Sequence, residues 1–205
     1  MKKKKYNEQE LFWANKFGNE YSKRKGHDPI KSLINLFSKI LSNTRKINNV
    51  IEFGPNIGRN IYAIKQINPK YQFTGVEINQ FACKKLEKIK NLEIVNKSIL
   101  EFESNTKYDF VLIKNVLIHI NTSHLNTAYK KLYESSKKYI CMIEYFNPTP
   151  TKILYRGHKN KLFKRDFCRE IMKKYPKLKL IDYGFVYKYD SKYPCDNINW
   201  FLLKK

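Results

Sequence analysis

The chain lacks the features that mark membrane and secreted proteins. No apolar run approaches the ~20 residues that a helix needs to cross a bilayer. The N-terminus is basic, with lysine at positions 2 to 5, but no apolar stretch follows it as in a secretory signal. The sequence therefore predicts a cytoplasmic protein without a membrane span.

Cysteine is scarce, and its spacing does not suit the common structural metal sites. The four cysteines are far apart, without a Cys-x-x-Cys or a Cys/His pair at ligand spacing. We expect no metal, and free, mostly buried thiols at Cys83, Cys141, Cys168 and Cys195.

Acidic residues are few: 18 Asp and Glu stand against 41 Lys and Arg, which gives a net charge of +23. Such a charge can indicate an RNA or DNA partner. It can also reflect biased composition, because Lys carries most of the surplus and is spread along the chain beside abundant Asn and Ile. The second interpretation is favoured, and the charge can still attract a negatively charged small substrate.

From residue 49 onward, strand patterns alternate with helix patterns. Strands are expected at 50–53, 71–78, 92–96, 108–113 and 138–144, and helices at 58–67, 80–89, 122–136 and 162–175. Two final strand patterns, 178–189 and 198–203, have no helix between them. This order predicts an α/β fold with a mostly parallel seven-stranded sheet, helices on both faces and an antiparallel last strand.

Residues 1–46 are expected to form a helical segment ahead of the core at 47–205, within a single domain overall. Asn7 and the early acids after it predict a helix start. A second amphipathic helix is expected from Ile30 to Leu41.

Aromatic residues recur every four positions in the first of these helices, at Trp13, Phe17 and Tyr21. This spacing places them on one helix face. The face either packs on the core or belongs to a lid that closes over a substrate, with Tyr21 projecting inward.

A glycine-punctuated turn, Gly54-Pro55-Asn56-Ile57-Gly58, joins the first expected strand to the helix after it. Glycine lets the backbone turn sharply and approach a ligand, and a helix start points unsatisfied N–H groups toward it. The spacing is neither the Gly-x-Gly-x-x-Gly of a dinucleotide site nor a phosphate loop.

Polar residues follow the next two strands. Glu77 ends the second strand a little over twenty residues beyond the glycine turn, where an acid can bind both hydroxyls of a ribose. The alternative is a solvated loop acid. After the third strand, residues 98–100 are placed to hold a base.

Glu52-Phe53-Gly54-x-x-x-Gly58, followed by Gly75-Val76-Glu77-Ile78, resembles class I S-adenosylmethionine-dependent methyltransferases, whose fold also ends in an antiparallel strand. The resemblance implies a Rossmann-like fold, methyl transfer and S-adenosyl-L-methionine as cofactor. Asn56 departs from the usual pattern because it stands where a middle glycine is common. The cofactor-binding residues implied are Glu52, Gly54, Asn56, Gly58, Glu77, Ile78, Ser98, Ile99 and Asn115.

A narrower resemblance runs from about residue 11 to the C-terminus. Over this range the sequence resembles the methylases associated with pseudaminic acid biosynthesis. This implies methyl transfer to an O or N of a small molecule, a sugar or sugar nucleotide of nonulosonate or surface-glycan biosynthesis. The matching segments are 12–21, 58–60, 116–121, 144–148, 155–158, 162–167, 182–187 and 200–203.

Catalytic candidates follow the fourth and fifth strands or lie in the expected lid. His119 is placed to take a proton near neutral pH, or else it packs under its loop. Tyr21 and Tyr145 are placed to orient a substrate amine or hydroxyl.

Arg156 is the main candidate for binding a substrate anion, because a guanidinium binds carboxylate or phosphate bidentately. Alternatively, it forms a salt bridge to Asp166 or Glu144. The other substrate-binding candidates are Trp13, Tyr21, Tyr155 and His158.

Two other functions stay open. The charge suggests a tRNA or rRNA methyltransferase, although neither Asn/Asp-Pro-Pro-Tyr/Phe nor Pro-Cys follows the fourth strand, as base-amine or C5 methylation of nucleic acid would require. The irregular glycine turn at Asn56 suggests a non-catalytic S-adenosylmethionine-binding subunit. The sequence leaves the oligomeric state open.

Overall fold

The computed structural model describes residues 6–24 and 28–205. The basic residues 1–5, interpreted above as no secretory signal, lie outside the described residues. Within the described part of the chain, no helix is both long enough and apolar enough to cross a membrane.

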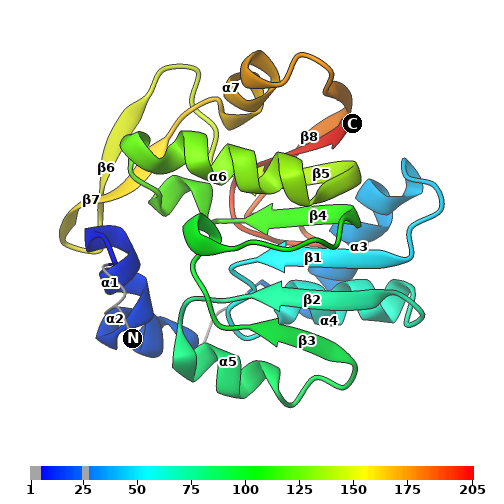
Figure 1. Ribbon diagram of the computed structural model, residues 1–205, viewed down its shortest axis with the longest axis horizontal. Coiled ribbons are helices and arrows are strands. Elements are labelled where there is room, and N and C mark those ends of the chain that lie inside the picture. Colours follow the sequence, from blue (N-terminus) through cyan, green and yellow to red (C-terminus); the bar gives the residue numbers. More distant parts are fainter. Residues whose placement is uncertain (1–5, 25–27) are drawn as a thin grey trace.

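One seven-stranded sheet forms the centre of the molecule, with its strands in the order β3-β2-β1-β4-β5-β9-β8 (Figure 1). The first five run parallel, whereas β9 is antiparallel to both β5 and β8. The expected mostly parallel sheet with an antiparallel last strand is confirmed. The strands are β1 (Asn49–Phe53), β2 (Gln72–Val76), β3 (Leu92–Val95), β4 (Tyr108–Lys114), β5 (Ser136–Glu144), β8 (Lys179–Val186) and β9 (Ile198–Lys204).

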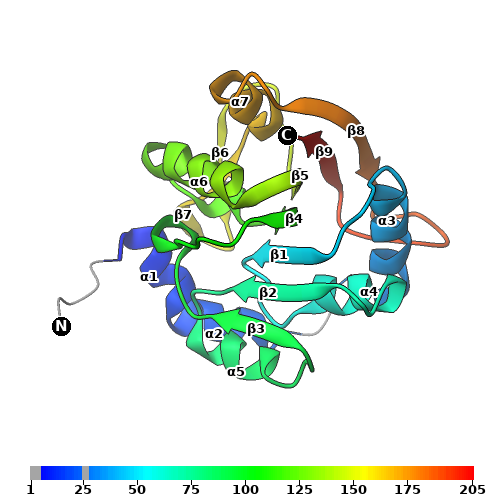
Figure 2. The same cartoon turned by 45° about the vertical axis from the view of Figure 1, so that its right-hand side comes forward.

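Helices cover both faces of this sheet (Figure 2). On one face, α3 and α4 pack around Phe37 and Ile64, and on the other, α6 and α7 pack around Leu132 and Ile171. Six of the seven residues of β4 are buried, as expected for a central strand covered on both sides. The helices are α3 (Ile30–Ser42), α4 (Arg59–Ile67), α5 (Gln80–Leu86), α6 (Thr122–Ser135) and α7 (Phe167–Lys174).

The helix expected at residues 162–175 is wrong in its first part. Residues up to Lys164 belong to β7 (His158–Lys164), which pairs with β6 (Thr151–Tyr155) in a separate two-stranded sheet. The turn between them consists of Arg156 and Gly157, which both have positive φ, at 51° and 81°. This is the backbone of a two-residue hairpin turn. Residues 155–158, which the sequence patterns left outside any helix or strand, form the tip of this hairpin.

The N-terminal helix is also divided. Its two parts, α1 (Glu8–Ala14) and α2 (Lys16–Ser22), meet at Asn15, whose φ and ψ of −110° and −145° are not helical. Asn7 caps α1 as expected, because its side chain accepts from the Glu10 N–H at 2.9 Å. We refer to residues 7–24 as the N-terminal helices.

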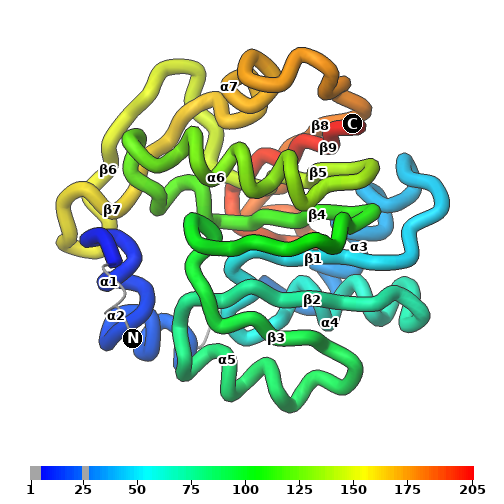
Figure 3. The backbone as a smooth tube through the Cα atoms, in the orientation of Figure 1, coloured from blue at the N-terminus to red at the C-terminus, as the bar shows by residue number. Residues whose placement is uncertain are grey.

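The N-terminal helices and the β6–β7 hairpin lie side by side at the edge toward which the parallel strands point (Figures 1 and 3). The rings of Phe12 and His158 join them, with centroids 4.9 Å apart. Two segments far apart in sequence therefore close one end of the sheet.

All four cysteines are free and buried, as expected.

Candidate functional site

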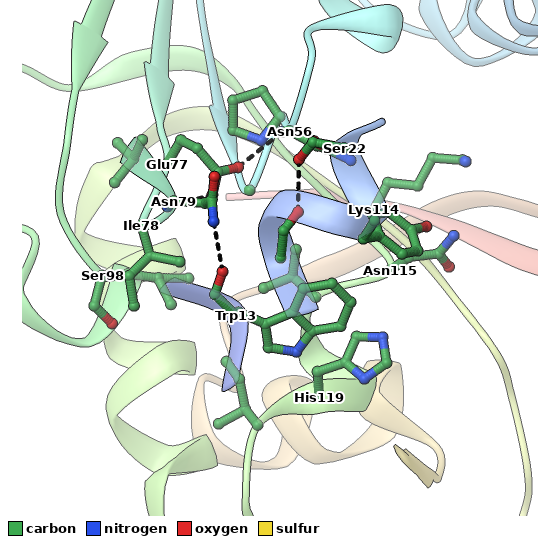
Figure 4. A pocket seen from close by; sticks show the side chains of 18 of the residues that line it. Trp13, Ser22, Asn56, Glu77, Ile78, Asn79, Ser98, Lys114, Asn115 and His119 are labelled. Atoms are coloured by element: carbon green, nitrogen blue, oxygen red, sulfur yellow. Dashed lines mark hydrogen bonds between the residues drawn. The ribbon is translucent and has the colours of Figure 1, made fainter. Parts of the chain in front are cut away.

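A cavity of about 390 Å³ lies at the carboxyl ends of the central strands. Its walls come from the glycine turn, from the residues that follow β2, β3 and β4, and from the N-terminal helices (Figure 4). In an open parallel sheet, this edge is where ligands bind. Eleven of the candidate residues line it: Trp13, Tyr21, Gly54, Asn56, Glu77, Ile78, Ser98, Ile99, Asn115, His119 and Arg156.

The two glycines of the turn are required by its backbone. Gly54 has a φ of 71°, and a Cβ there would lie 2.4 Å from Cγ2 of Val116. Gly58 has a φ of 80° at the start of α4, and a Cβ there would lie 2.3 Å from Cδ1 of Ile89. A side chain at either position would combine steric overlap with backbone strain. Gly58 shapes the turn from outside the cavity lining.

Asn56 adopts a left-handed backbone with a φ of 50°, which Asn tolerates better than most residues. Its N–H donates to Glu77 Oε2 at 2.8 Å, and its Oδ1 accepts from the Ser22 hydroxyl at 2.6 Å. The side chain at the position of the usual middle glycine therefore connects the turn to α2.

Glu77 is buried, with only 6% of its surface exposed, so the interpretation as a solvated loop acid does not apply. Its carboxylate accepts the N–H groups of Asn56 and Asn79, both at 2.8 Å. Burial raises the pKa of this carboxyl, and hydrogen bonds from backbone N–H groups, those of Asn79 and Asn56 foremost, oppose that shift. A carboxylate has about four acceptor sites, so two remain for hydroxyls of a ligand.

Asn115 follows β4 with a left-handed backbone, at a φ of 57°. Its backbone N–H donates to the Ile143 carbonyl at 3.0 Å. Its side-chain Oδ1 is buried and has no hydrogen-bond partner among the described residues. A donor group on a ligand in the cavity would satisfy this buried acceptor.

Glu52 lies beneath the glycine turn, outside the cavity lining. Its Oε1 accepts from Nδ2 of Asn60 at 2.7 Å, and Asn60 lines the cavity. Complete burial raises the pKa of Glu52 to about 7. The structure thus places Glu52 where it orients a wall residue.

The N-terminal helices form the wall opposite the strands. The ring of Trp13 contacts those of Phe17 and Tyr21, with centroids 5.3 and 5.2 Å apart, so the expected aromatic face exists. Nδ2 of Asn79 donates to the Trp13 carbonyl at 2.9 Å and to Asn19 Oδ1 at 2.8 Å. These bonds attach the helices to the segment after β2.

His119 lies in a short 3₁₀ turn, η2 (Leu117–His119), and its ring contacts those of Trp13 and Tyr155 at centroid distances of 4.6 and 4.9 Å. Its Nδ1 lies 2.5 Å from the Lys161 carbonyl, which can only accept, so Nδ1 carries the proton and Nε2 is left as an acceptor. Burial lowers the pKa of His119 to about 4. The expected pKa near neutrality is therefore wrong.

Tyr145 lies outside the cavity lining, and its hydroxyl donates to Asp196. Asp196, from the segment between β8 and β9, does line the cavity. Its N–H donates to Asp28 Oδ1 at 3.1 Å, and Asp28 Oδ2 pairs with Lys114 at 2.9 Å. Sequence reasoning missed these three residues. Lys114 carried a signal, since it ends an otherwise apolar strand, whereas no local motif marks Asp28 or Asp196.

Arg156 lines the cavity and lies over the Tyr155 ring, with its guanidinium carbon 5.6 Å from the centroid. The alternative salt bridges are wrong. Glu144 accepts backbone N–H groups, from Val116 at 3.0 Å and Leu117 at 2.9 Å, and Asp166 caps α7. Tyr155 and His158 lie outside the lining.

Within the described residues, no group of three His, Cys, Asp or Glu side chains could hold a metal ion.

No protein-family model and no curated protein matches the chain. Solved structures, in contrast, are similar to the chain in fold. A magnesium protoporphyrin IX methyltransferase from Synechocystis PCC 6803 with bound S-adenosylmethionine is similar over 98% of this chain and 99% of its own, at TM-score 0.68 and 10% identity. The N-methyltransferase NodS from Bradyrhizobium japonicum WM9, in complex with S-adenosylhomocysteine, is similar over 92% and 96%, at TM-score 0.67 and 13% identity.

An S-adenosylmethionine-dependent methyltransferase from Clostridium acetobutylicum ATCC 824 is similar over 86% of this chain and 92% of its own, at TM-score 0.64 and 12% identity. The chain therefore has the Rossmann-like fold of class I methyltransferases. The expected fold class is confirmed.

Proposed function

We propose that this protein is an S-adenosylmethionine-dependent methyltransferase that acts on a small molecule. The observation that carries the proposal is the convergence of the buried Glu77 carboxylate and the unsatisfied Asn115 Oδ1 on one cavity. They follow β2 and β4, the two strands that flank β1 and its glycine turn. Solved structures of the same fold hold S-adenosylmethionine or S-adenosylhomocysteine, which supports the cofactor.

The residues fit this cofactor. Glu77 has acceptor capacity left for both ribose hydroxyls. Ser98 and Ile99 lie in the cavity wall, where they would contact the base of the cofactor. Asn115 Oδ1 would accept from the methionine ammonium. A volume of about 390 Å³ is within the range of small-molecule sites. The bound cofactor supplies an electrophilic methyl group.

The N-terminal helices act as a lid in this proposal. Trp13 and Tyr21 line the cavity from the lid side, so they would exclude water from the acceptor and orient it. His119 and Tyr145 would complete the acceptor site, His119 through its Nε2 and Tyr145 through Asp196.

The acceptor that we propose is an anionic sugar or sugar nucleotide, as in nonulosonate or surface-glycan biosynthesis. Arg156 supports an anion, because it lines the cavity and has no carboxylate within ion-pair distance in the described part of the chain. The resemblance of the sequence to pseudaminic acid-associated methylases supports the sugar.

Calorimetric titration with S-adenosylmethionine tests the cofactor site. We expect Glu77→Ala to weaken binding about 100-fold, because two hydrogen bonds to a charged group are lost. Glu87→Ala, at an exposed residue after α5, should bind like wild type. No binding by wild type, or undiminished binding by Glu77→Ala, would refute the site.

Mass spectrometry of sugar nucleotides and glycans from cells with and without the protein tests the acceptor class. We expect species heavier by one methylene only in cells that contain it. A chain that binds the cofactor but changes no metabolite would support the non-catalytic alternative.

RNA methylation is the second candidate, and the net charge of +23 favours it. Filter binding with tRNA over a range of salt concentrations separates the two. We expect weak binding. Tight binding with a steep salt dependence would overturn the sugar proposal.

A further inference from the structure

A carboxylate that the proposed cofactor site does not use lines the same cavity. The Tyr145 hydroxyl and the Asn197 N–H each donate to one oxygen of Asp196. These two bonds fix the carboxylate in place. Each oxygen keeps a lone pair for a ligand in the cavity.

Aromatic rings gather near this carboxylate. Tyr145 bonds it directly, and burial, Tyr21 and Asp196 together raise the pKa of Tyr155. The Trp13 ring lies 6.3 Å from that of Tyr155 and 5.2 Å from that of Tyr21. Ring faces attract cations, and together with a carboxylate they recognise an ammonium group.

Two of the cations that share the cavity bind Asp28. Arg59 donates to its backbone carbonyl at 2.7 Å. Lys114 is paired with Asp28 at 2.9 Å. Arg24 and Arg156 lie over tyrosine rings, at 4.8 Å from Tyr21 and 5.6 Å from Tyr155. The arginines suit an anionic part of the same substrate, which leaves Asp196 for a positive part.

The bases available for a hydroxyl acceptor are poor. A hydroxyl must lose its proton during methyl transfer, which requires a matched base. His119, with its pKa lowered to about 4, is a weak one. Glu52 and Glu144 have pKa values raised to about 7 and about 8 by burial, but both lie outside the cavity lining. Three other carboxylates in the lining are occupied: Glu77 by the ribose in the proposed function, Asp28 by Lys114 at 2.9 Å, and Glu10 by the Asn7 N–H at 2.8 Å.

We propose, resting on the methyltransferase function above, that the acceptor atom is an amine nitrogen, bound as an ammonium by the Asp196 carboxylate in the cavity that Trp13 and Tyr21 also line. The ammonium releases one proton to water. The nitrogen lone pair then forms a bond to the methyl carbon as the carbon–sulfur bond breaks, and the electrons of that bond stay on sulfur. The nitrogen gains the positive charge that the sulfur loses, and Asp196 stabilises that charge as it develops.

A capping experiment tests the acceptor atom without knowing the substrate. The protein is incubated with S-adenosylmethionine carrying a trideuterated methyl group and a metabolite extract of its own cells. One half of the extract is first treated with N-hydroxysuccinimidyl acetate, which acylates amines and leaves sugar hydroxyls. We expect labelled product only in the untreated half.

The outcomes distinguish the two proposals. Labelled product in both halves would overturn the amine acceptor and leave the methyltransferase function standing. No labelled product in either half would overturn that function and the amine acceptor with it.

Variants then test Asp196 itself. Asp196→Asn should raise the KM for the extract-derived acceptor about 10- to 100-fold, because a charge-assisted bond is lost. Calorimetry should show its S-adenosylmethionine affinity within about twofold of wild type, which excludes misfolding as the cause.

Asp190→Asn is the matched control, an exposed Asp in the same segment whose side-chain oxygen accepts from the N–H groups of Lys192 and Tyr193. It should keep the wild-type KM. An unchanged KM in Asp196→Asn would overturn the assignment.

Discussion

The Ser22 hydroxyl donates to Asn56 Oδ1 at 2.6 Å, which joins the second N-terminal helix to the glycine turn. The same hydroxyl lies 2.8 Å from the Gly18 carbonyl oxygen, so it also contacts the backbone of its own helix. A ligand that orders the turn would thereby order the helix above it. The asparagine that looked like a defect in the glycine pattern acts as a link between two walls of the cavity.

Replacing Asn56 tests this link. Asn56→Gly keeps the left-handed backbone that glycine adopts freely and removes the bond to Ser22. We expect the S-adenosylmethionine off-rate, measured by stopped flow, to rise about 5- to 10-fold, since one partly buried hydrogen bond is lost. Amide hydrogen exchange in residues 16–24 should accelerate in parallel.

Two further variants control this experiment. Ser22→Ala should show the same direction of change, because it removes the other partner. Ser38→Ala, an exposed serine of α3, should leave the off-rate and the exchange unchanged. If Asn56→Gly holds the cofactor as long as wild type does, the link has no role in binding.

The sheet was predictable because each strand has its own local pattern, and Glu77 could be assigned because it directly ends a strand. The contact between Asp196 and Asp28 could not be predicted from the sequence. It joins positions 168 residues apart, and it exists because β9 inserts beside β5 and brings its preceding segment to the cavity. The hairpin at Arg156 was missed because residues 162–175 contain apolar spacing that suits a helix, while Asp166 delays the helix start.

The stability of the fold should depend on the protonation of His119. Its pKa is lowered from 6.5 to about 4 in the folded protein, so between these values the unfolded chain binds more protons. The stabilisation is present above pH 6.5 and is lost as pH falls toward 4. From pH 7 to pH 5 we expect a loss of about 2 kcal/mol in unfolding free energy, measured with urea.

Other buried groups also titrate, so the comparison is between variants. His119→Gln removes the titrating ring and keeps a donor for the Lys161 carbonyl, and its loss over the same range should be about 2 kcal/mol smaller than that of wild type. Equal pH dependence in wild type and His119→Gln would show that His119 is not held neutral.

Glu144 organises the turn that carries His119. Its carboxyl accepts N–H groups from Val116 and Leu117 at 3.0 and 2.9 Å, and burial raises its pKa to about 8. The neutral form therefore predominates at pH 7, and Glu144→Gln should cost less than about 1 kcal/mol. Glu144→Ala leaves the donors unsatisfied and should cost about 2–4 kcal/mol in denaturant unfolding. Equal stability of the two variants would contradict this role.

Arg156 offers a test of the anionic substrate that is independent of the acceptor atom. Arg156→Gln should raise the KM for the methylated metabolite at least about tenfold, because a charge-assisted bond to the anion is lost. Arg156→Lys keeps the charge without the bidentate geometry and should fall between Gln and wild type. Because Arg156 comes from the β6–β7 hairpin and not from the segments that carry Glu77 and Asn115, S-adenosylmethionine affinity should stay constant in both variants. Arg169→Gln, an exposed arginine on α7, controls for the change in net charge. If Arg156→Gln and Arg169→Gln alter the KM equally, the effect is long-range attraction by the basic surface, and the substrate anion is bound elsewhere.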